Sequence, residues 1–204
     1  MKKVLITGFE AFGKYTTNPS KWLAVSVDGK VIAGHEVHSL VFPIAVLFSE
    51  GTENPGEVIL RKAEEINADV IISFGLASEV KGFCLERSGI NWIYNEKYLS
   101  SFENNQLIDS SQPEKEQIQN NLSFWNIEKM QELFKDANIP FESKISDDAG
   151  GYACNVLIYT TLLAMKKKGA NIPYLFMDCA CTEEAIELIP DFDKNKVIIK
   201  KEDM

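Results

Sequence analysis

Two continuous apolar runs constrain the fold of this chain more than any other feature of its sequence. Residues 69–74 read Asp-Val-Ile-Ile-Ser-Phe and are closed by Gly75, and a second run covers residues 173–179. Unbroken runs of this length are typical of strands that are buried on both faces, as in the middle of a parallel sheet. The sequence therefore predicts that the chain is built around a central, mostly parallel sheet.

Further strands and helices alternate along the chain. Strands are expected over residues 3–7 and 35–42 and, more weakly, over 141–145, with extended chain over 81–95. Helices are expected over residues 19–27, 127–137, 152–168 and 182–188, and another begins at Asn54-Pro55. This alternation predicts one α/β domain over residues 1–204. Residues 100–121 are expected to form a long polar loop or lid, and residues 197–200 a terminal strand or a loose tail.

The charge balance narrows the classes of partner. The 204 residues carry 21 Lys and Arg against 30 Asp and Glu, a formal net charge of −9. An acidic surface argues against broad binding of nucleic acid or of an anionic membrane. No apolar run approaches the ~20 residues of a membrane span, and the apolar stretch at the start is too short for a signal peptide. We therefore expect a cytoplasmic protein whose four cysteines are free thiols.

The loop that follows the first expected strand carries two glycines and two phenylalanines within residues 7–13. It lacks both the Gly-x-Gly-x-x-Gly spacing of dinucleotide sites and the Lys-Ser/Thr of a P-loop, so no nucleotide cofactor is expected. Phe9 and Phe12 suit an apolar wall of a ligand site at the carboxyl end of a strand. Ordinary core packing is the alternative, and residue chemistry alone favours it.

Cys154 is the candidate nucleophile. It falls in the first turn of an expected helix, where backbone N–H groups and the helix dipole favour a thiolate. Gly150-Gly151, just before it, allows a tight turn and a close approach of the backbone. A buried, inert helix cysteine is the commoner alternative for any cysteine.

Other segments hold polar groups in apolar surroundings. Glu86 lies within the apolar segment Phe-Cys-Leu-Glu-Arg, so its carboxylate needs compensation. It can interact near Arg87, serve as a catalytic base, or face solvent at a sheet edge. The segment 178–181, Asp-Cys-Ala-Cys, has no second Cys or His cluster at ligand spacing, so no metal site is expected. His35 and His38 share one expected strand and are interpreted as surface residues.

Three segments carry a family resemblance. The first is residues 8–13 followed by Asn18-Pro19, the second is residues 75–77 followed by 85–91, and the third is residues 145–155. Together and in this order they resemble the motifs of the pyroglutamyl peptidase I family, the pyrrolidone-carboxylate peptidases. The family usually has Pro at Ala11, Gly at Lys14, Arg at Glu96 and a larger aliphatic residue at Ala153.

The resemblance implies a single three-layer α/β/α domain that assembles as a homo-oligomer, a tetramer or a dimer. It implies an enzyme that removes the N-terminal pyroglutamyl residue of peptides without a cofactor. Carried over by position, Cys154 is the nucleophile and Glu86 orients the base, while Phe9, Phe12 and Asn18 hold the lactam ring. The tail over residues 190–204 diverges from the closing helix that the family usually adds.

One position departs from the family pattern. The family's catalytic histidine follows a buried strand, and Asp178 occupies its place here. An Asp carboxyl has an ordinary pKa of about 4, so it is a poor base for a thiol whose pKa is about 8.5. Beside Glu86 it would also form a pair of carboxyls, of which one is pushed towards its protonated form.

Two interpretations follow for the whole chain. The first is a cysteine peptidase with altered base chemistry, and the second is a catalytically silent family member that binds a lactam-like ligand or a protein partner. A third, less supported interpretation makes Cys154 an oxidant-sensing thiol. The sequence assigns no role to Cys179 and Cys181.

Overall fold

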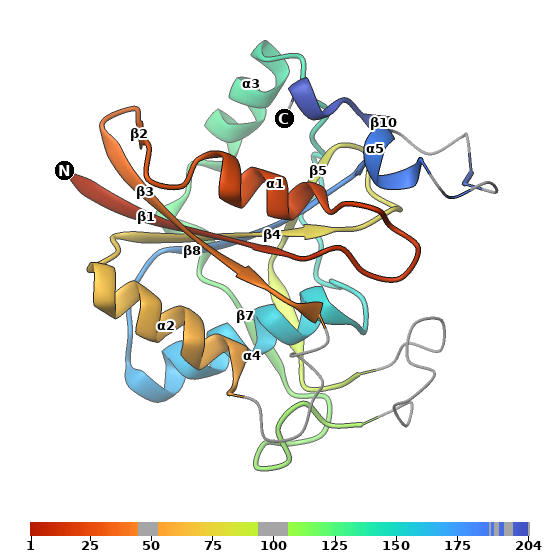
Figure 1. Cartoon of the computed structure of the whole chain (residues 1–204). Coiled ribbons are helices and arrows are strands. Elements are labelled where there is room, and N and C mark those ends of the chain that lie inside the picture. The colour runs from red at the N-terminus through yellow and green to blue at the C-terminus, as the bar shows by residue number, and fades with distance from the viewer. Residues whose placement is uncertain (45–52, 94–105, 188, 190–191, 194–197, 204) are drawn as a thin grey trace.

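The computed structural model describes residues 1–44, 53–93, 106–187, 189, 192–193 and 198–203. A six-stranded sheet in the order β2-β3-β1-β4-β8-β5 forms its centre (Figure 1). The four inner strands are parallel to one another, and β2 and β5 are antiparallel to their neighbours at the two edges. The strands are β1 (Lys2–Phe9), β2 (Val31–Ile32), β3 (His35–Phe42), β4 (Val70–Leu76), β5 (Phe83–Glu86) and β8 (Tyr174–Cys179).

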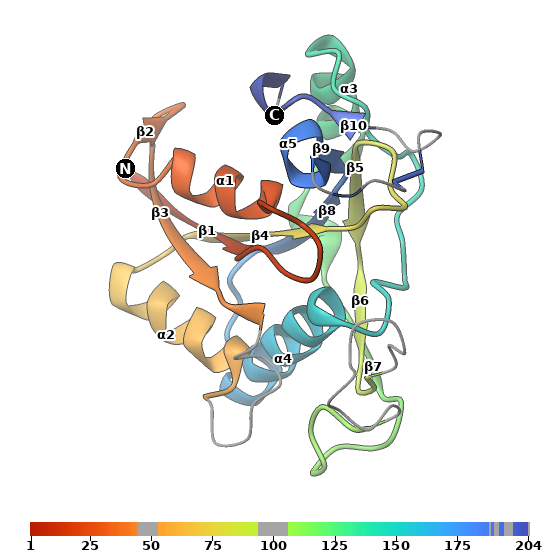
Figure 2. The ribbon, with the colours of Figure 1, turned by 45° about the vertical axis from the view of Figure 1, so that its right-hand side comes forward.

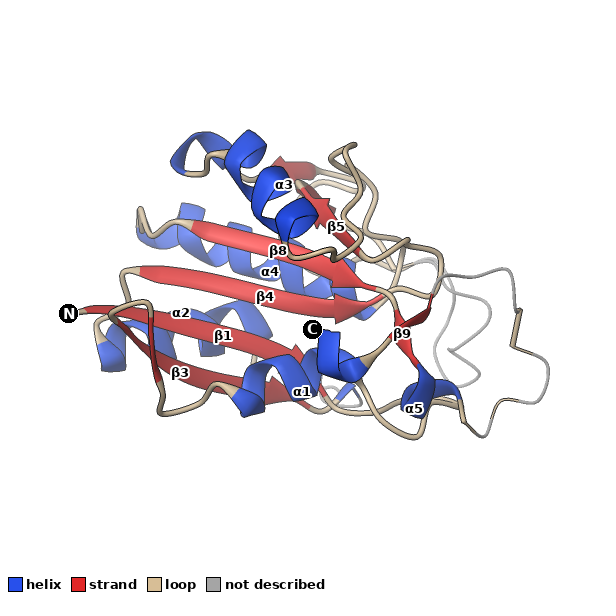
Figure 3. Cartoon of the chain, turned by 90° about the horizontal axis from the view of Figure 1, so that it is seen from above, coloured by secondary structure: helices blue, strands red, loops and turns tan. Residues whose placement is uncertain are grey.

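Helices cover both faces of this sheet, which confirms the predicted α/β/α layers. Helices α1 (Pro19–Ser26) and α3 (Ile127–Asp136) lie on one face, and α2 (Pro55–Ile66) and α4 (Ala153–Lys168) lie on the other (Figures 2 and 3). Each face has its own apolar core, so the central strands are buried on both sides as their apolar runs predicted. Helix α4, which corresponds to the helix expected over residues 152–168, is buried along most of its length.

Asparagine caps fix the start of two helices. Asn18 Oδ1 accepts the Ser20 N–H at 3.0 Å at the start of α1, and Asn54 Oδ1 accepts the Gly56 N–H at 2.9 Å at the start of α2. In both cases a proline follows the cap, where its missing N–H costs no hydrogen bond. Local sequence therefore sets both helix starts as predicted.

Two short pairings complete the fold. Strand β6 (Ser88–Ile90) pairs with β7 (Gln117–Gln119), and β9 (Cys181–Thr182) pairs with β10 (Ile198–Ile199). The short helix α5 (Glu183–Ile186) follows its cap residue Thr182, whose hydroxyl accepts the Ala185 N–H at 3.4 Å. The terminal-strand alternative for the tail is confirmed by β10.

The predicted strand over residues 141–145 is wrong. This segment makes only isolated bridges, one between Phe83 and Phe141 and another just beyond it between Glu86 and Ser146. Phe141 instead packs its ring 4.6 Å from the ring of Phe134 on α3, measured between centroids. The segment exchanges backbone hydrogen bonds with β5 near its two ends, but these do not join into a continuous ladder, and packing under a helix explains its apolar character.

A buried asparagine organises the described part of the polar loop. Asn91 is fully buried, and its side-chain Oδ1 accepts the N–H groups of Ile108 and Asp109 at 3.0 and 2.9 Å. Its Nδ2 donates to the carbonyls of Asp109 and Pro113 at 2.9 and 3.0 Å. Residues 106–121 are thus held to the body of the domain, whereas Glu96 lies outside the described residues. Within the described chain, no helix combines the length and apolar character needed to span a membrane.

Candidate active site

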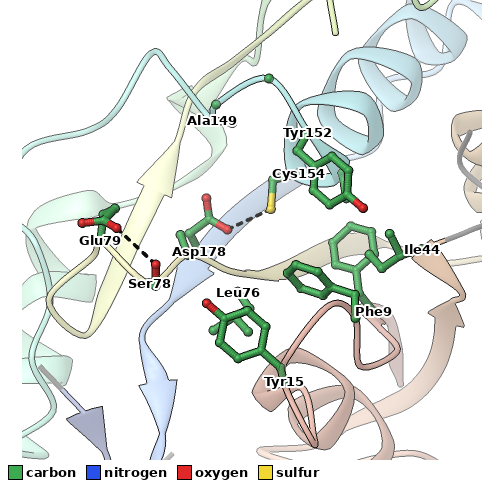
Figure 4. A pocket seen from close by; sticks show the side chains of 15 residues that line it. Phe9, Tyr15, Ile44, Leu76, Ser78, Glu79, Ala149, Tyr152, Cys154 and Asp178 are labelled. Atoms are coloured by element: carbon green, nitrogen blue, oxygen red, sulfur yellow. Dashed lines mark hydrogen bonds between the residues drawn. The ribbon is translucent and has the colours of Figure 1, made fainter. Parts of the chain in front are cut away.

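Cys154 and Asp178 meet at the carboxyl-terminal edge of the sheet. Asp178 lies one residue before the end of β8. Cys154 is the second residue of α4, the helix that packs on the same face of the sheet as the Asp178 side chain. The Cys154 Sγ lies 3.2 Å from Asp178 Oδ1 and donates a hydrogen bond to it (Figure 4). The predicted place of Cys154 in the first turn of a helix is confirmed.

Gly75 leaves open the space in which this thiol and carboxyl meet. It is the direct neighbour of Asp178 in the parallel pairing of β4 with β8. A Cβ atom on Gly75 would lie 2.3 Å from Asp178 Oδ1 and 2.6 Å from Cys154 Sγ, closer than non-bonded atoms approach. The sequence analysis missed this role, although a glycine that closes a buried strand at the site edge is a usable signal.

Glu86 lies behind Asp178 on the edge strand β5. The antiparallel pairing of β5 with β8 makes both carboxyls project from the same face of the sheet. Glu86 is only 4% exposed, and its Oε2 has no hydrogen-bond partner among the described residues. Arg87 pairs with Asp147 instead. Neither Arg87 nor solvent at the sheet edge therefore neutralises Glu86.

Burial keeps the groups of this cluster protonated to a higher pH than usual. It raises the pKa of Asp178, and burial together with the Asp178 charge raises the pKa of Glu86. Burial, followed by Asp178 and Glu86, raises the pKa of the Cys154 thiol well above its ordinary value. The help expected from the N-terminus of α4 is outweighed, so the thiol is neutral near pH 7.

A cavity of about 270 Å³ opens beside the pair, and both Phe9 and Phe12 line it. Two aromatic residues that the sequence analysis missed, Tyr15 and Tyr152, extend this wall. The Phe12 ring centroid lies 5.2 Å from that of Tyr15 and 5.9 Å from that of Tyr152. Phe9 is only 1% exposed and also belongs to the core, so this phenylalanine both packs in the core and lines the cavity. The position of Tyr152 directly after Gly150-Gly151 was the sequence signal that could have identified it as a residue of the cavity wall.

The cavity has an aromatic side and an acidic side. In Figure 4, Phe9 and Tyr152 lie on one side of Cys154, and Ser78 and Glu79 lie beyond Asp178 on the other. The Ser78 hydroxyl donates to Glu79 Oε1 at 3.2 Å. A flat apolar ring fits the first side, and a polar group attached to it would extend toward the second.

Asn18 supports the aromatic wall from behind. Its Oδ1 accepts the N–H and hydroxyl of Ser20, at 3.0 and 2.8 Å, and its Nδ2 donates to the Glu10 carbonyl at 3.1 Å. The Ser20 hydroxyl in turn accepts the Phe9 N–H at 3.0 Å. Asn18 is 2% exposed and is not among the described residues that line the cavity. Its side chain therefore positions the backbone behind Phe9 rather than facing the cavity.

The two histidines lie away from this site. His38 is paired with Leu5, four residues before the Phe42 that pairs with Phe9 at the cavity. At ~3.3 Å per strand residue this is about 13 Å along the strand. His35 lies further still in the same direction. Neither supplies a base to Cys154.

Cys179 and Cys181 lie outside the cavity. Both are buried, and the Cys179 Sγ donates to the Gly75 carbonyl at 2.9 Å. Within the described ranges, no group of three or more His, Cys, Asp or Glu side chains is arranged to hold a metal ion.

The chain is similar to known proteins along most of its length. A family model described as pyroglutamyl peptidase matches residues 2–197. A pyrrolidone-carboxylate peptidase of Clostridium perfringens is 36% identical over 172 residues, which are 83% of this chain and 74% of that protein. Another, of Thermococcus litoralis, is 29% identical over 191 residues, 91% of this chain and 80% of that protein.

A solved structure shares the fold. The pyrrolidone carboxyl peptidase of the hyperthermophile Pyrococcus furiosus superposes with a TM-score of 0.79 and 28% sequence identity. The match covers 98% of this chain and 91% of the other.

Proposed function

The chain belongs to the pyroglutamyl peptidase family, and from this membership we propose that it binds the N-terminal pyroglutamyl residue of a peptide and cleaves the bond after it, with Cys154 as the nucleophile. One observation carries the proposal: the Cys154 thiol donates to Asp178 Oδ1 at 3.2 Å in the wall of a cavity. A nucleophile and a proton acceptor within hydrogen-bond reach are the minimum for acyl transfer by a thiol.

The cavity supplies recognition of the lactam ring. Phe9, Phe12 and Tyr152 offer an apolar surface to a five-membered ring, and Asn18 holds the chain behind Phe9 through Ser20. Rigid support of this kind keeps the ring, and hence the scissile carbonyl, in one place relative to Cys154.

The proposed reaction uses Asp178 to carry one proton in two directions. The Cys154 sulfur attacks the scissile carbonyl carbon while its proton passes to the ionised Asp178. The carbon–nitrogen bond then breaks, and Asp178 returns the proton to the leaving amine. Water then attacks the thioester carbonyl carbon and gives one proton to Asp178; the carbon–sulfur bond breaks, and Asp178 passes this proton to the Cys154 sulfur, which restores the thiol and the ionised carboxylate. The proposed donors to the negative charge on the carbonyl oxygen are the backbone N–H groups in the first turn of α4, where Cys154 lies.

Glu86 assists by staying protonated. Because burial and Asp178 raise the Glu86 pKa, one carboxyl of the pair holds a proton while Asp178 is ionised. A neutral Glu86 spares the thiolate from a second nearby negative charge. We therefore assign Glu86 a positioning and charge-limiting role rather than contact with substrate.

A second candidate function is recognition without turnover. The neutral Cys154 thiol, whose pKa burial and Asp178 raise, favours it. In this case the cavity binds a pyroglutamyl peptide or a related lactam, and the protein acts through that complex or through a protein partner. Homo-oligomeric assembly stays a prediction under either function, and light scattering of the purified chain tests it.

Hydrolysis of a fluorogenic pyroglutamyl amide separates the two functions. The wild type is measured beside Cys154→Ser and Asp178→His, with Asp136→His, on the exposed end of α3, as a matched control. Wild-type turnover that Cys154→Ser abolishes supports the peptidase.

A silent wild type with an active Asp178→His variant contradicts the peptidase and supports binding without turnover. If wild type and Asp178→His are both silent, thermal stabilisation by L-pyroglutamide decides. No shift in melting temperature at millimolar ligand would contradict lactam recognition altogether.

A further inference from the structure

Helix α4 carries Cys154, but its burial does not set its rotation about its own axis. The residues from Val156 to Ala164 are buried in unbroken succession, so every face of this stretch is covered. The hydrophobic effect is non-directional and depends on the area removed from water. Burial therefore holds α4 in the domain without deciding which way Cys154 points.

Asn155, the residue after Cys154, supplies this direction. Its side chain is 2% exposed, and its Oδ1 accepts the Ile90 N–H at 2.8 Å. Its Nδ2 donates to the carbonyls of Ile90 and Trp92 at 3.0 and 2.9 Å, which uses both N–H donors of the amide. These three bonds tie the first turn of α4 to strand β6 and to the residues just after it.

We propose that Asn155 is the positioning residue of Cys154: its hydrogen bonds fix the rotation of α4 and so aim the thiol at Asp178. Successive residues of an α-helix point about 100° apart around its axis. With Asn155 held on β6, Cys154 is turned toward β4 and β8, where Gly75 and Asp178 lie. The inference deepens the proposed function and rests on it only for the chemical role of the thiol.

A second contact lies on the same face of α4, one turn further along. Tyr159 follows Asn155 by four residues, which places both on one side of the helix. A Cβ on Gly89 of β6 would lie 2.5 Å from the Tyr159 nitrogen, so the two backbones are in close contact there. Close contact brings helix and strand together, whereas the Asn155 bonds are directional. The buried Thr160 hydroxyl donates to the Val156 carbonyl of its own helix at 2.7 Å, so this bond does not orient α4.

The start of α4 is held from this side rather than by a cap. Tyr152 stands at the cap position, and its side chain makes no capping hydrogen bond to the helix. A side-chain cap accepts N–H groups of the first turn, the same groups that we propose as donors to the carbonyl oxygen. Asn155 fixes the first turn through distant backbone groups and does not use those N–H donors.

A small rotation of α4 is enough to separate the thiol from Asp178. Side-chain atoms lie about 5 Å from the axis of a helix, so a turn of about 20° moves them by about 2 Å. The Cys154 Sγ lies 3.2 Å from Asp178 Oδ1, and such a turn away from Asp178 breaks this hydrogen bond. Loss of the Asn155 bonds should therefore uncouple Cys154 from Asp178.

A double-mutant cycle on the reactivity of Cys154 tests this positioning. Burial and the Asp178 charge raise the thiol pKa, so Asp178→Asn should speed alkylation by iodoacetamide at least about tenfold in the wild-type background. In the Asn155→Ala background the same substitution should change the rate less than about threefold, or half a pKa unit. A purely structural role of Asn155 would lower stability and leave this ratio unchanged.

Asn120→Ala is the matched control. Asn120 is also a buried asparagine whose Nδ2 donates to a distant carbonyl, that of Tyr174, at 2.7 Å. Tyr174 lies four residues before Asp178 on β8, about 13 Å along the strand at ~3.3 Å per residue. The tenfold effect of Asp178→Asn should persist in this background, even where both alanine variants lower the free energy of unfolding alike.

Turnover gives a second readout if the wild type is active. A misplaced catalytic group lowers the rate of the chemical step, by up to ~100-fold for an error of about 1 Å. Asn155→Ala should therefore lower kcat at least about tenfold and keep KM within about threefold. Phe9 and Phe12, which we propose bind the ring, belong to β1 and the loop after it. A loss carried by KM contradicts the positioning role.

Two results of the cycle overturn the proposal. One is an Asp178→Asn effect in Asn155→Ala as large as in wild type, and the other is an effect that is lost equally in Asn120→Ala. If Asn155→Ala does not fold, Asn155→Ser takes its place in the same cycle. Its hydroxyl fills part of the buried space, but with one donor it cannot replace both N–H donors of the amide.

The cycle also separates this inference from the proposed function. Coupling that is lost in Asn155→Ala, in a protein that does not hydrolyse a pyroglutamyl amide, contradicts the peptidase and leaves the positioning role standing. Turnover by the wild type with undiminished coupling in Asn155→Ala contradicts the positioning role alone. If Asp178→Asn has no effect on alkylation of the wild type, both fail, because both need the thiol beside the Asp178 charge.

Discussion

Gly75 and Asp178 are direct partners across β4 and β8, and their pairing leaves no room for a Cβ on Gly75. The room that the missing Cβ leaves is filled from the side by the Cys154 sulfur. The contact between thiol and carboxyl is therefore built by backbone register as much as by the two side chains themselves. Substitutions at Gly75 report on that contact without removing either reacting group.

Gly75→Ala should destabilise the protein by about 1–3 kcal/mol, the usual cost of an overpacked site. The new methyl group collides with Cys154 Sγ and Asp178 Oδ1. Urea unfolding measures the loss, and a double-mutant cycle with Cys154→Ala locates it. We expect Gly75→Ala to cost less in the Cys154→Ala background, because the sulfur is gone. Equal costs in the two backgrounds would show that the collision lies elsewhere.

Stability should fall as pH rises from about 5 to 8. Burial raises the pKa of Glu86 and Asp178 above the ~4 of the unfolded chain, so the folded state holds more protons in this window. The stabilisation is complete below the unfolded pKa and is lost as pH passes through the folded values. We expect a decrease on the order of a few kcal/mol, since each pKa unit is worth about 1.4 kcal/mol.

Denaturant titrations at several pH values check this slope. The Glu86→Gln, Asp178→Asn double variant should flatten it. Carboxyls with lowered pKa, such as Asp109 and Asp147, act in the opposite sense only below about pH 4, where unfolded carboxyls titrate. A wild-type stability that rises between pH 5 and 8 would contradict the assignment of raised pKa values.

Cys154 should react slowly with iodoacetamide at pH 7, more slowly than free cysteine. Only the thiolate reacts, and burial with Asp178 and Glu86 raises the thiol pKa. Asp178→Asn should speed alkylation about tenfold or more, because one pKa unit changes the thiolate fraction tenfold. Mass spectrometry assigns the modified residue and separates it from the buried Cys84, Cys179 and Cys181. Alkylation as fast as that of a free thiol would remove the case for a neutral Cys154 and favour a sensor role.

Asn18→Ala and Asn54→Ala form a matched pair. Each removes an asparagine cap that precedes a helix-starting proline, so each should cost about 0.5–2 kcal/mol in thermal or urea unfolding. Only Asn18→Ala should also weaken binding of L-pyroglutamide, because Asn18 holds Ser20 and Glu10 behind Phe9. Equal effects of the two variants on binding would deny Asn18 a place in ligand recognition.

The elements of the fold were predictable where one local pattern decided them. The apolar runs over residues 69–74 and 173–179 predicted β4 and β8, and Pro19 and the Asn54-Pro55 pair predicted the starts of α1 and α2. Residues 141–145 misled because their apolar side chains serve packing under α3, which sequence periodicity does not distinguish from a strand. Tertiary packing, rather than local preference, decided that segment.

The candidate site was predictable only in its membership. Motif spacing pointed to Cys154, Glu86 and Asp178, but not to the direct contact of the thiol with Asp178 or to the unpartnered Oε2 of Glu86. These features depend on strand register and on burial, which follow from long-range pairing. The same holds for Gly75, because the absence of a Cβ atom there leaves room for the Cys154 sulfur beside Asp178. The motif suggested that Asn18 contacts the ligand, whereas in the structure its side chain binds Ser20 behind the cavity wall.

The register of the central strands also governs how the protein reaches its working state. Strands β1, β4 and β8 pair residues that are far apart along the chain, and Cys154 joins them from yet another segment. Pairings of this kind form late, because the entropy of closing long loops is lost before the contacts repay it. A partly folded chain therefore has no cavity beside Cys154. Any ligand of that cavity therefore binds and stabilises only the completely folded protein. Its presence during refolding should raise the yield of native protein and leave the rate of the first collapse unchanged.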